Sequence, residues 1–268
     1  MKSPLVQEWG LRSVFRARHR LTRVMRSVRR ALLATLFPVL LFAQETGVPV
    51  ENDEGRELAA LIVDAAGGDR WKRTGGTLVF DFVLAVGDSE IARYHHRWTP
   101  TEDRYSVWGI TRDGRPWRVD FSSLSRRESG AMIDGETAVD SFGQRIRSSG
   151  YGRYINDTYW LMMPVKLLDS GVHHARLPDT VIEGQRLNVL AIWFDNVGLT
   201  PGDRYRIFSD PRTHVVTRWR YHLQSGRSAE HHWENVEEIG PLRLPTRRRA
   251  VEGGGEIRFE ASWEGSRE

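Results

Sequence analysis

Alternation of apolar and polar residues with a period of two is the feature that most restricts how this chain can fold. It is clearest in residues 77–86, where every even position from Leu78 to Val86 is apolar. Residues 215–223 and 256–263 repeat the pattern, with charged and polar residues at the intervening positions. Successive side chains of a strand point to opposite faces, so this pattern predicts antiparallel strands with one buried and one solvated face.

Turn residues separate the predicted strands. An Asp-Gly pair at 113–114 lies between the extended runs 105–110 and 117–121, and a second pair at 134–135 separates two further short runs. Asp-Gly between extended segments is a strong hairpin signature. About ten strands at this regular spacing predict a mainly β protein, built as a sandwich or a barrel.

Residues 187–194 differ from the other predicted strands because apolar residues occupy both faces. A strand that is apolar on both sides is covered on both sides. We therefore expect either that the outer side of the sheet is capped here, or that its inner side holds another part of the chain or a ligand.

Two helical segments are predicted. The first begins near Arg56 and ends at the glycines 67–68, with one apolar stripe formed by Leu58, Leu61, Ile62 and Ala65. The second lies in residues 151–171, where Asn156 or Asp157 caps a short helix that Pro164 ends. Apolar residues surround this second helix, so we expect it to be buried against the sheet.

The positive charge of the chain is concentrated at its N-terminus. The whole chain has a formal charge of +4, yet residues 1–43 hold nine Lys and Arg against one acid, which leaves −4 for the remainder. Basic residues precede the apolar run 31–42 and a small-residue site at Ala43, as in a cleavable signal peptide. The apolar run is shorter than the ~20 residues that span a bilayer. The alternative is a buried N-terminal helix of a cytoplasmic protein.

This pattern predicts export to the periplasm or the medium. The chain has no cysteine, so we expect neither a lipid anchor nor disulfides, and stability must come from a core. The mildly acidic body gives no reason to expect a nucleic-acid partner. The predicted organisation is a signal peptide at 1–43 with a possible start at Met25, a flexible leader at 44–55 and a single domain at 56–268.

Three segments carry a family resemblance. The most distinctive is Asn156–Leu167, with Asn156, Asp157, Pro164 and Lys166 as its motif residues. The second is Arg206–Thr213, which contains Asp210-Pro211 and precedes another strand, and the third is the opening from the first helix to the strand at Leu78. Together they resemble an uncharacterised secreted bacterial family related to the Lol-type periplasmic lipoprotein carriers, over roughly residues 56–263.

The resemblance implies a fold and a function. The fold would be an unclosed antiparallel β-barrel of ten or eleven strands, with short helices plugging the concave side. Relatives of this type hold acyl chains or other lipid between sheet and helices and carry them across the periplasm. The implied function is a carrier or binding protein for a hydrophobic or amphipathic ligand, with an envelope membrane or membrane protein as a possible partner.

Large aromatic and methionine side chains suit an apolar ligand, because aromatics give rigid surface and Met adapts to irregular shapes. The chain has ten tryptophans. The residues predicted to line a cavity are Phe80, Phe82, Trp108, Tyr159, Trp160, Met163, Trp193 and Trp219. The alternative for each of them is that it only fills a core.

Other functions remain as alternatives. Histidine doublets at 95–96, 173–174 and 231–232 place one ring on each face of a strand, a poor spacing for a metal site, and we predict neither metal nor cofactor. A periplasmic hydrolase could use these histidines or carboxylates such as the pairs 195/203 and 234/237, although the sequence has none of the common hydrolase motifs. A third possibility is a module whose sheet edge binds a partner protein.

Overall fold

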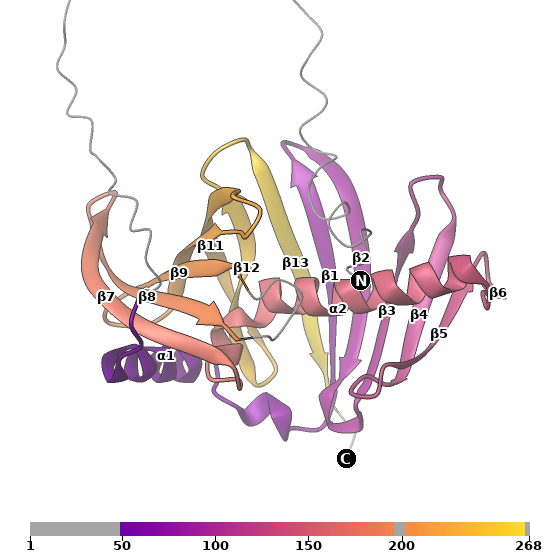
Figure 1. Cartoon of the computed structure of the whole chain (residues 1–268), viewed down its shortest axis with the longest axis horizontal. Helices are drawn as coiled ribbons and strands as arrows, with labels where there is room; N and C mark the ends of the chain where they lie inside the picture. Colours follow the sequence, from indigo (N-terminus) through magenta and orange to yellow (C-terminus); the bar gives the residue numbers. More distant parts are fainter. Residues whose placement is uncertain (1–48, 196–201, 266–268) are drawn as a thin grey trace, which may run out of the picture. The chain divides into compact units, whose positions relative to one another are not determined.

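The computed structural model describes residues 49–195 and 202–265, which form one curved sheet with two helices on its inner side (Figure 1). The predicted signal peptide at 1–43, the alternative start at Met25 and the leader residues 44–48 lie outside the described residues. Within the described part, no helix is both long and apolar enough to cross a membrane.

The sheet contains thirteen antiparallel strands in the order β6-β5-β4-β3-β2-β1-β13-β12-β11-β10-β9-β8-β7. A mainly β, unclosed sheet is therefore confirmed, with more strands than the ten or eleven expected. The strands are β1 (Thr77–Val86), β2 (Ser89–Thr99), β3 (Arg104–Ile110), β4 (Pro116–Ser123), β5 (Glu128–Ile133), β6 (Glu136–Thr137), β7 (Val172–Ile182), β8 (Gln185–Phe194), β9 (Arg204–Ser209), β10 (Val216–His222), β11 (Ser228–Ile239), β12 (Leu242–Ala250) and β13 (Gly255–Glu264).

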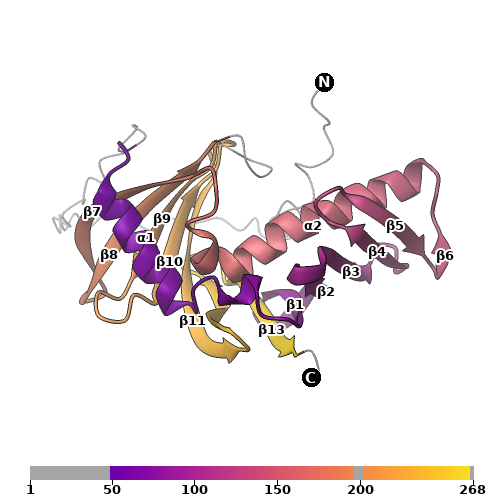
Figure 2. The same cartoon turned by 90° about the horizontal axis from the view of Figure 1, so that it is seen from below.

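The strand order explains why the chain needs a long helix. The first and last strands pair in the middle of the sheet, from Thr77↔Glu264 to Val86↔Gly255, so β6 and β7 become its two edges. These edges are consecutive in the chain, and α2 (Ser141–Lys166) joins them across the inner face (Figure 2). A helix of 26 residues is about 39 Å long, whereas thirteen strands spaced about 4.8 Å apart cover an arc of about 58 Å. The sheet must therefore curl so that α2 spans the chord.

The helix α2 is much longer than the sequence predicted. It begins after Asp140, whose side chain accepts a hydrogen bond from the Gly143 amide at 2.8 Å. Gly150 lets the helix approach β4 closely, because a Cβ there would lie 2.8 Å from the Val119 side chain. The predicted cap at Asn156 or Asp157 is wrong, since both lie inside the helix, and Pro164 does not end it.

The helix α1 (Asp53–Ala65) packs against β7 and β8. It begins three residues before the predicted start, because Asn52 caps it through a 2.8 Å hydrogen bond from the Gly55 amide. The predicted stripe is correct for Leu58 and Ile62, whereas Leu61 is exposed. The helix ends just before glycines 67–68, as expected, and both glycines have positive φ. The chain also has two short 3₁₀ turns. Arg70–Lys72 precedes β1, and Pro100–Glu102 lies between β2 and β3.

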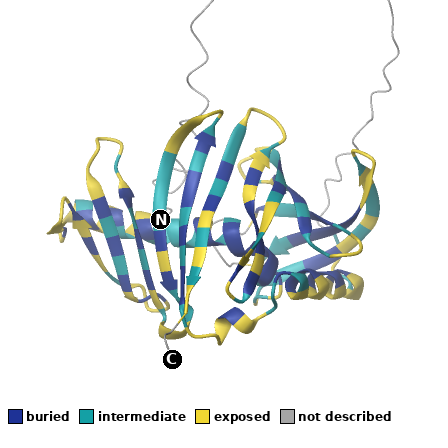
Figure 3. Ribbon diagram, turned by 180° about the vertical axis from the view of Figure 1, so that it is seen from behind, coloured by how far each residue is buried: buried dark blue, intermediate teal, exposed yellow. Residues whose placement is uncertain are grey.

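Burial alternates along the strands, as the sequence predicted (Figure 3). The buried apolar residues of the inner face form two clusters. The N-terminal cluster joins β1–β5, β12 and β13 to α2, and the C-terminal cluster joins β8–β11 to α1 and the last turns of α2. Strand β8 is covered on both faces, as expected, because Leu190 and Ile192 face the helices while Leu187 and Val189 pack in a small outer cluster.

Candidate functional site

A buried polar network joins α2 to the N-terminal half of the sheet. The imidazole of His96 on β2 lies between the Tyr105 hydroxyl, 2.5 Å from Nδ1, and the Asp157 carboxylate of α2, 3.2 Å from Nε2. Asp157 also accepts from Asn156 at 2.7 Å and from Arg153 at 3.4 Å. His96 and Asp157 are both 0% exposed. The contacts assign the proton of the ring to Nε2, facing the carboxylate, while Nδ1 accepts from Tyr105.

The charges of this network follow from its burial. Burial opposes ionisation of Asp157, but the Arg153 charge and the His96 contact outweigh it, and the pKa of Asp157 is lowered. Burial also lowers the pKa of His96, although Asp157 favours the charged ring. The network is therefore an ionised Asp157–Arg153 pair beside a neutral histidine. The network holds α2 against β2. Because His96 and Asp157 are sealed from solvent, they offer no acid–base group to a substrate.

A buried arginine holds the C-terminal end of α2. Pro164 has no N–H, so it leaves the Trp160 carbonyl without its helical hydrogen bond. Arg248 on β12 supplies the missing donor, with Nη2 at 2.9 Å from that carbonyl and Nη1 at 2.7 Å from the Pro245 carbonyl. Its guanidinium stacks 3.5 Å from the Trp233 ring centre and is 0% exposed. This contact explains why the helix continues through a proline.

Aromatic rings fill the inner face beside this arginine. We call the following residues the C-terminal aromatic cluster: Trp160, Tyr205, Trp219, Tyr221, His231 and Trp233. The centroid of Trp219 lies 4.7 Å from that of Trp160, 4.9 Å from that of Tyr205 and 5.3 Å from that of Trp233. Trp160 and Tyr205 are partly exposed, whereas the other members are buried. Next to them, Tyr159 and Phe194 are also partly exposed, so a row of aromatic surface reaches solvent here.

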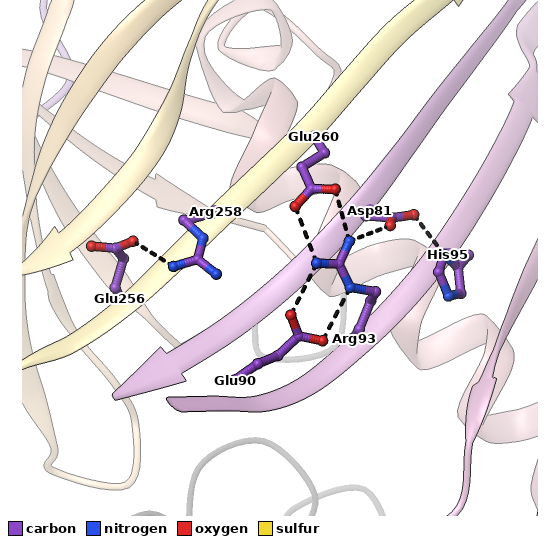
Figure 4. Close-up of polar contacts among 7 residues, drawn as sticks. All are labelled: Asp81, Glu90, Arg93, His95, Glu256, Arg258 and Glu260. Carbon is purple, nitrogen blue, oxygen red and sulfur yellow. Dashed lines mark hydrogen bonds and ion pairs between the residues drawn. The ribbon is translucent and has the colours of Figure 1, made fainter. Parts of the chain in front are cut away.

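The outer face is polar and its charges are matched. Arg93 on β2 contacts three carboxylates, those of Asp81 at 2.6 Å, Glu260 at 2.8 Å and Glu90 at 2.9 Å (Figure 4). Hydrogen bonds to these three acids raise the pKa of Arg93. His95 donates from Nδ1 to the Asp81 carboxylate at 2.7 Å on the same face. This ladder ties β1, β2 and β13 together and leaves no unpaired charge among the residues drawn.

A shallow hollow of about 520 Å³ lies beside this ladder. It occurs where β12 and β13 separate, since these strands pair at only three positions, from Arg247↔Arg258 to Arg249↔Glu256. Most of its lining residues are polar, among them Asn235, Glu237, Thr246, Arg258, Glu260 and Ser262. This hollow does not supply the apolar cavity that the sequence predicted.

The predicted cavity residues fall into three groups. Phe80, Phe82, Met163 and Trp219 face the helices and are buried in the two inner clusters. Tyr159 and Trp160 lie on α2 and are partly exposed on the inner side. Trp108 and Trp193 lie on the outer face, because they stack on His95 and His173 at centroid distances of 5.4 and 5.7 Å. These two cannot line a space between sheet and helices.

The motif residues also have structural roles. Asn156 and Asp157 belong to the buried network, and Lys166 pairs with Asp169 at 2.6 Å. Asp210 precedes Pro211 in the turn between β9 and β10, where its carboxylate accepts from the Arg212 and Thr213 amides at 2.9 and 2.8 Å. The strand–turn–strand hairpin expected at this motif is therefore present.

The carboxylates of the two pairs proposed for a hydrolase have separate partners among the described residues. Asp195 pairs with His173 at 2.9 Å, whereas the buried Asp203 accepts from the Gln224 amide at 2.9 Å. Glu234 pairs with Arg249 and Glu237 bonds to Thr246. Within residues 49–195 and 202–265, no three His, Asp or Glu side chains are placed to hold a metal ion.

Sequence reasoning missed the two residues that hold α2, although the pattern contained a signal for each. His96 shares its strand face with Tyr94 and Trp98, so a histidine occupies an apolar face. Arg248 similarly follows Leu242 and Leu244 at even spacing. A polar residue on an apolar face must find a buried partner, and both do.

No family model matches the chain, and no curated protein matches it in sequence. Solved structures similar to it include a LolA superfamily protein from Nitrosomonas europaea, with a TM-score of 0.48 and 15% identity, covering 78% of this chain and 94% of that one. A DUF1329 family protein from Desulfovibrio piger has a TM-score of 0.46 and 11% identity, covering 80% and 94%. A putative outer membrane lipoprotein-sorting protein domain from Vibrio parahaemolyticus has a TM-score of 0.44 and 11% identity, also covering 80% and 94%.

Proposed function

We propose that this protein is an exported carrier or binding protein for a hydrophobic or amphipathic ligand, such as a lipid or an acyl chain. The proposal places the ligand on the inner face, beside the C-terminal half of α2. The observation that carries it is the row of partly exposed aromatic side chains formed by Tyr159, Trp160, Phe194 and Tyr205. Covering such a surface with a hydrocarbon chain is favourable, since transfer of apolar area from water gives roughly 25 cal/mol per Å².

The inner face is filled in the described conformation, so binding requires a movement. Trp160 is the natural moving part, because it is partly exposed and its ring covers Trp219 and His231 at centroid distances of 4.7 and 5.2 Å. A change of its side-chain rotamer opens the surface beneath it and leaves the ring against the bound ligand, while the helix backbone stays bound to Arg248. Such rotamer changes cost little relative to binding an acyl chain.

The test is uptake of a fluorescent fatty acid by the delipidated protein, with two tryptophan variants. We expect saturable binding of one ligand per chain, weakened about tenfold or more in Trp160→Ala, because the contact of a large aromatic ring is lost. Trp108→Ala is the matched control, since Trp108 is also partly exposed but lies on the outer face. Absence of uptake by folded protein, or equal loss in both variants, contradicts the proposal.

Export is tested separately, by expression in a Gram-negative host and N-terminal sequencing of the product. The predicted signal peptide ends at Ala43, so we expect a periplasmic or secreted protein that begins at Gln44. An intact N-terminus in the cytoplasm contradicts this part of the proposal.

A further inference from the structure

Four buried polar atoms without a hydrogen-bond partner lie in or against the C-terminal aromatic cluster. They are Nε1 of Trp219, Nε1 of Trp233, Nε of Arg248 and Nδ1 of His231. The four residues are 2%, 3%, 0% and 9% exposed, so water does not readily reach them. Buried polar groups in proteins are nearly always paired, so a group of four in one place requires an explanation.

These atoms belong to side chains that contact one another. The Arg248 guanidinium lies 3.5 Å from the Trp233 ring centre, and the rings of Trp233 and Trp219 are 5.3 Å apart. Trp160 links Trp219 to His231, at centroid distances of 4.7 and 5.2 Å. The four side chains that carry the unpaired atoms are therefore neighbours on the inner face.

The chemistry of the unpaired atoms selects an acceptor. Both indole nitrogens and the Arg248 Nε carry hydrogens and can only donate. The partners of the Arg248 guanidinium are carbonyl oxygens of Trp160, Leu161, Pro245 and Arg247, together with the rings of Trp233 and Phe259. Burial alone lowers the pKa of Arg248 well below its ordinary value, which reflects how poorly its charge is compensated. An oxygen with negative charge would pair the donors and balance the guanidinium.

We propose that the C-terminal aromatic cluster, with Arg248, binds the oxygen acceptor at the head of an acyl chain, either a carboxylate or an ester. The inference rests on the proposed function and adds the head-group chemistry of the ligand. A cationic head group is excluded from this site, because it offers no acceptor and meets the charge of Arg248. The hydrocarbon chain would then extend along the aromatic row at Tyr159 and Phe194.

Competition against a fluorescent fatty acid tests this with three twelve-carbon amphiphiles that differ only at the head: laurate, methyl laurate and dodecyltrimethylammonium, each below its critical micelle concentration. We expect laurate to compete at least about tenfold better than the ammonium compound, the effect of one hydrogen bond to a charged group. Competition by methyl laurate as strong as that by laurate shows that an uncharged ester oxygen suffices as the acceptor, and weaker competition shows that the site requires a carboxylate.

Trp→Phe variants test the site itself, because each removes one N–H and keeps most of the ring. We expect Trp233→Phe and Trp219→Phe to reduce the preference for laurate over the ammonium compound by about three- to tenfold. Trp71→Phe is the matched control, since Trp71 is buried and its Nε1 is also unpaired, but it belongs to the N-terminal cluster. The control should leave the preference unchanged.

The outcomes separate this inference from the proposed function. Equal competition by all three amphiphiles, or equal effects of Trp233→Phe and Trp71→Phe, overturns the head-group site and leaves acyl-chain binding intact. Failure of every amphiphile to bind the folded protein overturns both.

Discussion

The two halves of the inner face hold α2 by opposite kinds of chemistry. At the N-terminal half, the ion pair of Asp157 and Arg153 is completed by His96. At the C-terminal half, Arg248 binds backbone carbonyls and stacks on Trp233, and nearby polar atoms stay unpaired. The first arrangement places a carboxylate between an arginine and a histidine, whereas the second holds the unpaired donors on which the proposed head-group site rests.

The aromatic rings of the two halves differ in the same way. In the N-terminal half, arginines cover the partly exposed rings, with Arg153 3.9 Å from Tyr94 and Arg127 4.2 Å from Tyr151. In the C-terminal half, Tyr159, Phe194 and Tyr205 cover one another, with centroid distances of 5.6 to 6.3 Å. Rings that are already satisfied by cations have less to gain from a ligand. This difference supports our proposal that a ligand binds at the C-terminal half of the inner face.

The largest expected effect is at the N-terminal half. Asp157→Ala leaves the largely buried Arg153 without its carboxylate, and we expect a loss of about 3–5 kcal/mol in the free energy of unfolding, measured with urea. Asp120→Ala is the control, because the Asp120–Arg118 pair is 45%/43% exposed on the outer face and should contribute no more than about 1 kcal/mol. Similar losses in the two variants would remove the distinction between a sealed network and a surface pair.

Acid should destabilise the protein through buried histidines at both ends. Burial lowers the pKa of His96 and of His174, and burial together with the Arg248 charge lowers the pKa of His231 from 6.5 to about 4. The unfolded chain takes up protons as the pH falls below about 6.5 while these folded histidines stay neutral, so stability decreases from about pH 7 to about pH 4. His231 alone accounts for about 3 kcal/mol of that decrease.

The variant His231→Gln tests this contribution. Its urea stability should fall less steeply between pH 7 and pH 4, whereas His222→Gln, at an exposed position of β10, should keep the slope of the parent protein. His173 acts in the opposite direction, because Asp195 and Glu51 raise its pKa. A slope unchanged by His231→Gln would show that the aromatic cluster admits protons freely.

A double-mutant cycle tests the role of Arg248 in holding α2. Arg248→Met removes the donor to the Trp160 and Pro245 carbonyls, and we expect a loss of about 2 kcal/mol in unfolding free energy. Adding Pro164→Ala restores an N–H to the helix at the residue that can bond the Trp160 carbonyl, so about 1 kcal/mol should return. Strict additivity of the two substitutions would contradict the account of how the helix continues through Pro164.

The smallest effects are at the helix starts. Asn52 caps α1, and it also bonds the backbone of the edge strand β7, accepting from the Arg176 amide at 2.9 Å. Asn52→Ala should lose about 1–2 kcal/mol, and Asp140→Ala, which removes the cap of α2, about 1 kcal/mol. Thermal unfolding of both variants gives the comparison. A larger loss in Asp140→Ala would mean that the edge contact of Asn52 adds nothing.

The strands could be predicted because the sheet buries one face. Leu78, Phe80 and Phe82 alternate with polar or smaller positions, and the Asp-Gly pairs at 113–114 and 134–135 form the expected hairpin turns. Local sequence carries this information, since period-two burial is imposed residue by residue.

The long helix could not be predicted from local sequence. Residues 141–156 form no apolar stripe. They are rich in Gly, Ser and Arg, and Gly and Ser are weak helix formers. The helix forms because the chain must join two distant sheet edges. Its proline is tolerated because Arg248 donates to the Trp160 carbonyl, and this partner lies 88 residues away, where local sequence gives no sign of it. Local sequence predicts Asp157 as a helix cap for the same reason. Its partner His96 comes into contact with it only when α2 packs on β2.

The sequence shows only in part which aromatic side chains lie on the inner face of the sheet. The alternation of Tyr105 and Val107 already excludes Trp108 from the inner side, which the prediction overlooked. For Trp193 no such signal exists, because β8 is apolar on both faces. That residues 1–43 are a cleaved signal peptide, and that residues 56–268 are a single domain, stay predictions.

The most direct test of ligand binding at the C-terminal half is hydrogen–deuterium exchange of the delipidated protein with and without saturating laurate. We expect slower exchange in residues 158–167 of α2 and in β10 and β11, with β3 to β5 unchanged. Protection centred on β3 to β5, or no change anywhere with laurate bound, would contradict it.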